Sequence, residues 1–247
     1  MNDHTVWVGW DEEEMRAAGV ATWSIREHGY AGTVRRVSIA DMRRRGLYQR
    51  PTTIQDGRRW DLISAAPMST GHAIARFLVP HLQQYQGWAV FVDGDILALS
   101  NLHDLFALAD PRYAVQVVQH APMPNAIEKK AGHAQVLYHR KNWSSVILWN
   151  CAHPAHLALD LARVNSVPGR DLHRFDWLED DQIGALPAGW NYLVGVTEPE
   201  PTPVHIAHYT LGTPDTVPVE DRWRDAWTTA ATQAGYVDYK RVHTVRT

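Results

Sequence analysis

Two aspartates follow an apolar run near the middle of the 247-residue sequence. The run covers residues 88–92 (WAVFV), which is typical of a strand buried on both faces, and Asp93-Gly94-Asp95 comes directly after it. Residues two apart on extended backbone point to the same side, so both carboxylates can converge on one cation, and Gly94 adds no bulk between them. Two hard oxygen ligands leave most of an octahedral shell open, which suits Mn²⁺ or Mg²⁺ held jointly with a substrate diphosphate. The pattern predicts a site for a metal–nucleotide complex.

An acidic turn at the end of a strand is the alternative interpretation of this tripeptide. Two neighbouring carboxylates at the edge of a hydrophobic core repel each other unless a cation is present, and apolar residues 96–99 (ILAL) follow, so the context favours the metal site. The tripeptide is also similar to the motif of phosphohydrolases with a nucleophilic aspartate after a buried strand. Their motif normally begins the domain and is followed by Thr or Ser, neither of which holds here.

Alternating strand and helix patterns surround the motif and predict an α/β fold with a largely parallel central sheet flanked by helices. In such a sheet, ligands bind at the carboxyl ends of the strands, which is where the two aspartates would lie. A polar, arginine-rich excursion from the sheet is expected over residues 41–59. The expected strands are residues 6–10, 33–39, 88–92, 114–118, 146–149 and 204–209, and the expected helices are residues 11–28, 70–80, 155–164, a short one from 180, and 221–234.

Composition excludes some classes of protein. Lys and Arg number 24 against 27 Asp and Glu, so no global field attracts nucleic acid or an anionic membrane. Cys151 is the only cysteine, so an internal disulfide is excluded and a reducing compartment fits. No stretch approaches the roughly 18 apolar residues that span a bilayer, and residues 1–5 lack the pattern of a signal peptide. We expect a cytoplasmic protein.

Several blocks together resemble, in order, those of nucleotide-sugar glycosyltransferases of the GT-A fold. They are most similar to glycosyltransferase family eight, the group of glycogenin and bacterial galactosyltransferases. The resemblance implies one GT-A (Rossmann-like) domain over residues 1–247, with residues 216–247 as a C-terminal helical extension. The blocks that carry it are residues 6–26, 70–80, 90–106, 143–150, 178–182 and 206–214.

The resemblance also implies a third metal ligand. In residues 206–210 (IAHYT), His208 occupies the place of the family's metal-binding histidine. A neutral imidazole beside Asp93 and Asp95 completes a mixed nitrogen and oxygen site for Mn²⁺. His205 lies three residues earlier on the expected strand and should face the opposite side.

Further residues are assigned to the donor sugar nucleotide and to catalysis by the same resemblance. The carboxylate of Asp181 would bind sugar hydroxyls and the Gln182 amide would support the developing oxocarbenium ion, although Asp181 could instead cap a helix. The implied catalytic residues are Asp180, Asp181 and Gln182. The implied donor-binding residues are Gly9, Trp10, Arg76, Asp93, Gly94, Lys141, Trp143, Ser144 and Ser145.

Two blocks depart from the family pattern. The late block reads Thr213-Pro214-Asp215 and lacks the family's lysine, so we expect Lys141, Lys130 or Arg76 to neutralise the diphosphate. Residues 143–150 resemble the strand that lines the family's sugar pocket. Residues 143–146 of this strand read WSSV, where the family usually has Asn, a small residue and Gly, so the identity of the sugar is not determined.

The sequence therefore predicts a metal-dependent glycosyltransferase that takes a sugar from a nucleoside-diphosphate donor, a UDP-sugar, with Mn²⁺ or Mg²⁺ as cofactor. Family resemblance implies retention of configuration by front-face displacement, with the departing phosphate taking the acceptor proton. The acceptor hydroxyl is open: a glycan, a lipid-linked glycan, a protein, a small molecule or a modified nucleic-acid base, the last not favoured. The alternative function is a non-catalytic nucleotide-sugar binding protein.

Two other groups of residues are given structural roles. Cys151, His153 and His156 form a compact cluster without an evident fourth ligand, and we expect it to be structural. The basic group in the excursion is expected to be solvated, the alternative being contact with a phosphate-bearing acceptor such as nucleic acid. Its members are Arg43, Arg44, Arg45, Arg50, Arg58 and Arg59.

Overall fold

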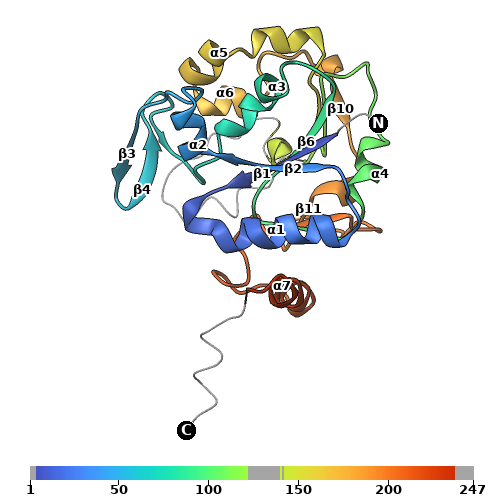
Figure 1. The fold of residues 1–247 in the computed structure, drawn as a ribbon. Coiled ribbons are helices and arrows are strands. Elements are labelled where there is room, and N and C mark those ends of the chain that lie inside the picture. Colours follow the sequence, from blue (N-terminus) through green and yellow to red (C-terminus); the bar gives the residue numbers. More distant parts are fainter. Residues whose placement is uncertain (1–3, 122–139, 141, 237–247) are drawn as a thin grey trace.

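The central feature of the computed structural model, which describes residues 4–121, 140 and 142–236, is a six-stranded sheet of order β10-β8-β9-β6-β1-β2 (Figure 1). Strand β9 is antiparallel to β6 and β8, and every other neighbouring pair is parallel. The expected α/β fold with a largely parallel sheet is confirmed. The strands are β1 (Thr5–Trp10), β2 (Thr33–Ser38), β6 (Trp88–Val92), β8 (Val115–Val117), β9 (Val146–Asn150) and β10 (Ile183–Ala185).

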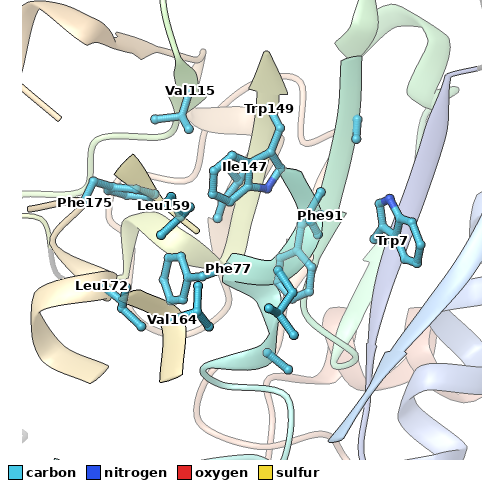
Figure 2. Packing of buried hydrophobic residues seen from close by; sticks show 14 of the residues in the cluster. Trp7, Phe77, Phe91, Val115, Ile147, Trp149, Leu159, Val164, Leu172 and Phe175 are labelled. Carbon is cyan, nitrogen blue, oxygen red and sulfur yellow. The ribbon is translucent and has the colours of Figure 1, made fainter. Parts of the chain in front are cut away.

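The central strands are apolar throughout because both faces of the sheet are covered. Successive side chains point to opposite faces, so Phe91, Ile147 and Trp149 enter one cluster (Figure 2) while Val90 and Leu148 enter another. The first cluster is covered by α2 (Ile39–Arg44), α3 (Val79–Leu82), α5 (Leu161–Ser166) and α6 (Gly169–His173), and the second by α1 (Met15–Glu27) and α4 (Leu102–Phe106).

A second, three-stranded sheet lies beside the first and holds the late strand of the chain. It has the order β11 (Tyr192–Leu193), β12 (Ile206–His208) and β7 (Ile96–Ala98). Strand β12 runs antiparallel to β7 and places His208 opposite Ile96, one residue after Asp95. The C-terminal helix α7 (Asp221–Gln233) buries Trp223 and Trp227 against this sheet and α1.

The arginine-rich excursion is a small folded unit rather than a solvated loop. After α2 it forms a sheet of β3 (Thr52–Gln55), β4 (Arg58–Asp61) and β5 (Ala66–Pro67), which projects from one end of the molecule (Figure 1). The expectation of a solvated Arg50 is wrong, because its side chain is buried in a bidentate pair with Asp61, at 2.8 and 2.5 Å. The other five arginines of the group lie at least partly at the surface.

Two expected helices are interrupted. Only the end of residues 70–80 is helical, as η2 (Ala75–Leu78), before α3 starts at Val79. Pro80 explains the break, since it is tolerated in the first turn of α3 but would clash with a carbonyl four residues earlier in a continuous helix. Residues 155–164 divide into η5 (Pro154–Ala158) and α5. The remaining single turns are η1 (Glu12–Glu14), η4 (Trp143–Ser145), η6 (Asp180–Gln182) and η7 (Ala188–Asn191).

Helix length also bears on membranes. Within the part of the chain that the structure describes, no helix combines the length and the apolar character that crossing a bilayer requires.

Candidate metal centre

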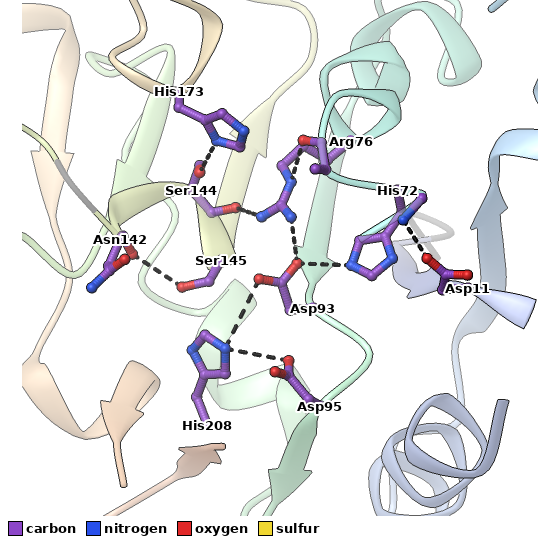
Figure 3. A network of polar contacts seen from close by, with 12 residues as sticks. Asp11, His72, Arg76, Asp93, Asp95, Asn142, Ser144, Ser145, His173 and His208 are labelled. Carbon is purple, nitrogen blue, oxygen red and sulfur yellow. Dashed lines mark hydrogen bonds and ion pairs between the residues drawn. The ribbon is translucent and has the colours of Figure 1, made fainter. Parts of the chain in front are cut away.

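Three predicted residues come together at the carboxyl edge of the main sheet. Asp93 follows β6, Asp95 precedes β7, and His208 ends β12, so the six-stranded sheet and the β11-β12-β7 sheet both contribute to the site (Figure 3). One ligand atom from each residue lies within 4.8 Å of the other two. His208 Nε2 is 3.3 Å from Asp95 Oδ1 and 3.9 Å from Asp93 Oδ2. Among the described residues this is the one group of three or more acidic, histidine or cysteine side chains with such spacing.

Asp93 is held from one side by two nitrogen donors. Arg76 approaches its Oδ1 at 2.7 Å, and His72 Nε2 lies 3.2 Å from the same oxygen. Burial by itself would raise the pKa of Asp93, but the Arg76 guanidinium and then His72 outweigh it and hold that pKa well below its ordinary value. Asp93 is therefore a fixed carboxylate anion whose second oxygen, Oδ2, faces His208.

Arg76 serves the protein interior rather than an open donor pocket. Its side chain is about 5% exposed, and its Nε donates to the carbonyl of Ala73. One terminal nitrogen donates to the carbonyl of Ser144, and the other pairs with Asp93. The guanidinium thus ties η2, η4 and the end of β6 together, and its predicted contact with the donor stays a prediction.

His208 is fixed by a buried amide on the side away from the aspartates. Asn191, fully buried at the end of η7, has its Oδ1 3.1 Å from His208 Nδ1. Burial lowers the pKa of His208, but Asp95 and then Asp93 outweigh it, so that pKa lies above its ordinary value. Without a cation, the protonated form of the imidazole is therefore favoured, and its positive charge compensates part of the negative charge of the two carboxylates.

Two further carboxylates add negative charge near the centre. Asp11, buried after β1, accepts from the main-chain nitrogens of Gly71 and Glu13. Glu14 has a pKa raised to about 7, by partial burial and by Asp95 and Asp11 in that order. The part of this rise that comes from the neighbouring carboxylates reflects local negative charge, which a bound cation would reduce.

Two of the predicted donor-binding residues are glycines that close packing requires. A Cβ on Gly9 would lie 2.4 Å from the ring of His72, and a Cβ on Gly94 would lie 2.6 Å from the carbonyl oxygen of Gly9. The ends of β1 and β6 therefore approach each other too closely for side chains. Trp10, also predicted to contact the donor, is half-buried beside them, with the Arg36 guanidinium carbon 3.7 Å from its ring centroid.

The residues expected to line the sugar pocket lie at the start of β9. Ser145 is buried next to Asp93, and its carbonyl accepts from the Asp93 main-chain nitrogen. Ser144 contacts His173 Nδ1 through its hydroxyl, at 2.7 Å, and Trp143 donates to the carbonyl of His120. Lys141 and Lys130, the proposed partners of the diphosphate, lie outside the described residues.

The structure does not bring the three expected catalytic residues to this centre. The Gln182 carbonyl accepts from the nitrogen of Ala114, and the pairing of β8, β9 and β6 places Ala114 level with Trp88. Asp93 follows the other end of β6, so Gln182 lies about five residues, or roughly 16 Å, back along the strands and three strands across. It belongs to the opposite edge of the sheet.

The same three residues have local structural partners instead. Glu179 and Gln182 form a capping box around η6, in which Gln182 Oε1 accepts from the Glu179 nitrogen at 3.1 Å. Asp180 pairs with Arg140 and is 94% exposed, and Asp181 is exposed as well. The residue that caps η6 is thus Glu179, and not Asp181 as the alternative interpretation had it.

The cluster of Cys151, His153 and His156 has the expected structural character. His153 Nδ1 accepts from the nitrogen of Ala155 and caps η5, while His156 Nε2 is 3.0 Å from the carbonyl oxygen of Ala114. Cys151 is buried, and burial raises the pKa of its thiol.

Three residues of the centre were missed by the sequence reasoning. These residues are His72, Asn191 and His120, of which His72 and Asn191 have apolar neighbours and follow the turn-forming residues Gly71 and Gly189, whereas His120 follows the buried strand β8. That pattern indicates a buried polar side chain, but it does not say which partner the side chain meets.

The donor set determines which cation the centre could hold. Two carboxylate oxygens and one imidazole nitrogen suit Mn²⁺ and Mg²⁺, and an incoming diphosphate could supply the other ligands. The acidic surroundings and the fixed anion of Asp93 fit a divalent cation. The arrangement is thus chemically suited to a metal bound together with a phosphorylated substrate.

Comparison with known proteins identifies relatives of the chain. No protein-family model matches it. Protein CDI of Arabidopsis thaliana is 40% identical over 227 residues, which cover 90% of this chain and 80% of Protein CDI.

Solved structures reproduce the arrangement of the elements. Glycosyltransferase GlyE of Streptococcus pneumoniae TIGR4 matches with a TM-score of 0.57 and 17% identity over 96% of this chain, which spans 61% of the length of GlyE. Galactosyltransferase LgtC, in complex with donor and acceptor sugar analogs, matches with a TM-score of 0.55 and 13% identity over 98% of this chain and 100% of LgtC. The chain therefore belongs to the family of Arabidopsis Protein CDI, and it has the GT-A fold that the sequence predicted.

Proposed function

We propose that the protein is a metal-dependent glycosyltransferase that moves a sugar from a nucleoside diphosphate, with a UDP-sugar as donor, to an acceptor hydroxyl. The observation that carries the proposal is the convergence of Asp93, Asp95 and His208 at the carboxyl edge of a GT-A sheet. Ligands bind at this edge in open α/β sheets. The fold likeness to LgtC, whose structure contains donor and acceptor sugar analogs, supports the same assignment.

Each part of the centre has a defined task in this proposal. Asp93, Asp95 and His208 would hold Mn²⁺ or Mg²⁺, which when bound stabilises the negative charge of a departing diphosphate. Arg76 and His72 keep Asp93 ionised and turn one of its oxygens away from the ligand-binding side. Because these contacts are made by the protein itself, the charge of Asp93 would not have to reorganise during the reaction.

Retention by front-face displacement follows from the family resemblance. In that mechanism the departing phosphate takes the proton of the acceptor, so a protein base is not required. We assign no sugar contact to Asp180, Asp181 and Gln182, because Gln182 lies level with the start of β6, Asp180 pairs with Arg140, and Asp181 is exposed. Of the predicted donor-binding residues, Trp10 is the proposed contact of the nucleotide base and Trp143 that of the sugar.

A non-catalytic nucleotide-sugar binding protein is the second candidate. The position of Gln182 favours this alternative. Gln182 was predicted to support the cationic transition state, and it lies too far from Asp93 to do so. The same metal centre would then serve for binding alone.

Turnover of nucleotide sugars separates the two functions. The protein is incubated with Mn²⁺ and a panel of UDP-sugars, and release of UDP is measured with and without candidate acceptors. We expect slow metal-dependent hydrolysis that Asp95→Asn abolishes while the circular dichroism spectrum is unchanged. Saturable binding without UDP release would support the binding protein, and an active Asp95→Asn variant would refute the metal-dependent mechanism.

A further inference from the structure

We propose that Asn191 is a positioning residue that selects the metal-binding tautomer of His208. The inference deepens the proposed function, because it concerns the same centre. It rests on a chain of hydrogen bonds whose direction can be deduced step by step from the main chain to the imidazole. The chain runs from Asn142 through Ser145 and Asn191 to His208.

The first step fixes the role of the Ser145 hydroxyl. Its oxygen lies 3.0 Å from the main-chain carbonyl of Asn142, which can only accept (Figure 3). A hydroxyl has one proton to donate, and this bond uses it. Towards any other neighbour, Ser145 Oγ is therefore an acceptor.

The second step fixes the orientation of the Asn191 amide. One of its terminal atoms lies 2.8 Å from Ser145 Oγ. Since that oxygen accepts, the atom must be the nitrogen Nδ2, and the carbonyl oxygen Oδ1 must face the other way. The second proton of Nδ2 points to His120 Nε2, at 3.0 Å, and burial lowers the pKa of His120 to about 4, so this imidazole is neutral and can accept.

The third step fixes the tautomer of His208. Asn191 Oδ1 lies 3.1 Å from His208 Nδ1 and can only accept, so Nδ1 must carry a proton. The electron pair of the neutral ring is then on Nε2, the atom that lies 3.3 Å from Asp95 and 3.9 Å from Asp93. The other tautomer would place a proton on Nε2, where a metal ion has to bind.

Burial makes this selection strong. Asn191 is fully buried and His208 is about 3% exposed, so water does not replace a lost partner easily. Both protons and the oxygen of the amide have partners, and a reversed amide would set Oδ1 against Ser145 Oγ, whose proton is already donated to Asn142. Partners of metal-binding histidines typically change metal affinity 10- to 100-fold when they are removed.

Mn²⁺ affinity of two Asn191 variants tests the inference without any enzymatic assay. Asn191→Leu removes the acceptor for His208 Nδ1, whereas Asn191→Asp keeps an acceptor there, and both lose the donation to Ser145 and His120. We expect electron paramagnetic resonance titration to show affinity about 10- to 100-fold weaker for Asn191→Leu, and at least about tenfold tighter for Asn191→Asp than for Asn191→Leu. Thermal melting checks that each protein is folded.

A pair of serine variants covers the case in which Asn191→Leu does not fold. Ser145→Ala removes the group that orients the amide and should weaken Mn²⁺ binding. Ser24→Ala is the matched control, since Ser24 is also buried and also donates to a carbonyl, of Ala21, and accepts from an N–H, of Ala98, but lies in α1. It should bind Mn²⁺ like the wild type.

The outcomes are distinguishable. Equal loss in Asn191→Leu and Asn191→Asp would indicate a merely structural role, and unchanged affinity in both, or in Ser145→Ala, would overturn the inference while the proposed function stands. A wild-type protein that binds no Mn²⁺ would remove the proposed function together with this inference.

Discussion

The two aspartates of the metal centre should differ sharply in what they contribute to folding. Asp93 neutralises Arg76, whose guanidinium is about 5% exposed, whereas Asp95 is 23% exposed and its ion-pair partner among the described residues is His208. Both Asp93→Asn and Asp95→Asn remove a charged metal ligand. We expect both to abolish Mn²⁺ binding, but only Asp93→Asn to destabilise the metal-free protein strongly.

The magnitude follows from the burial of the pair. Leaving one partner of a buried ion pair without its counter-charge costs about 3–5 kcal/mol. For a chain of this size each kcal/mol lowers the melting temperature by about 2–4 °C, so Asp93→Asn should melt roughly 6–20 °C below the wild type. The Asp95–His208 pair is partly solvated, and its loss should change the free energy of unfolding by no more than about 1 kcal/mol.

Urea denaturation in EDTA, followed by tryptophan fluorescence, measures both free energies of unfolding. Equal destabilisation by the two variants would refute the reasoning, because it would mean that Asp93 does not compensate the buried guanidinium. The double variant Asp93→Asn/Arg76→Met is the control. It removes both charges and should recover part of the lost stability, although it still cannot bind Mn²⁺.

The remaining predictions concern charge near and far from the centre. Because the pKa of Glu14 is raised in the folded protein to about 7, its contribution to stability is present below its unfolded value of 4.5 and is lost as pH rises through 7. Glu14→Gln should therefore melt higher than the wild type at pH 8 in EDTA and the same at pH 4, and equal melting at pH 8 would contradict this. Asp61→Asn should cost about 3–5 kcal/mol in urea denaturation without changing Mn²⁺ affinity, because Arg50 is fully buried away from the centre. Burial alone raises the pKa of Asp61, but Arg50 and Ser64 outweigh burial and lower that pKa overall. The loss of stability in Asp61→Asn should therefore become smaller only below about pH 4, as the wild-type carboxylate becomes protonated. An undiminished loss of stability as the pH falls further would contradict this prediction.

The sequence predicted those parts of the fold in which local pattern and burial agree. Residues 88–92 form β6 because an all-apolar run fits a strand covered on both faces. Asp93 and Asp95 share a site because they directly follow this strand and are two residues apart. The local sequence alone is enough to predict both facts. The prediction of one continuous helix over residues 70–80 was wrong. It took no account of Pro80, which is tolerated only in the first turn of a helix.

The partners of the centre could not be predicted in the same way, because they come from distant segments. His72 contacts Asp93 across 21 residues of sequence, and Asn191 contacts His208 across 17. His208 in turn comes to lie near Asp95 because β12 pairs with β7 in the second sheet. No periodicity in the sequence records that pairing. The family resemblance supplied His208, but it assigned no role to Asn191.

The block of Asp180 to Gln182 shows where a local motif is an insufficient guide to position. Gln182 is followed at once by β10, so main-chain pairing with β8 fixes it at the start of a strand. Residues at the start of β10 and residues after the end of β6 lie at opposite edges, since these two strands run the same way. For the block to reach Asp93, β10 would have to slip by about five residues, which would break its pairing with β8 and expose Ile183. The catalytic support that the motif implied must therefore come from other groups at the carboxyl edge, or the chain binds its ligand without transferring it.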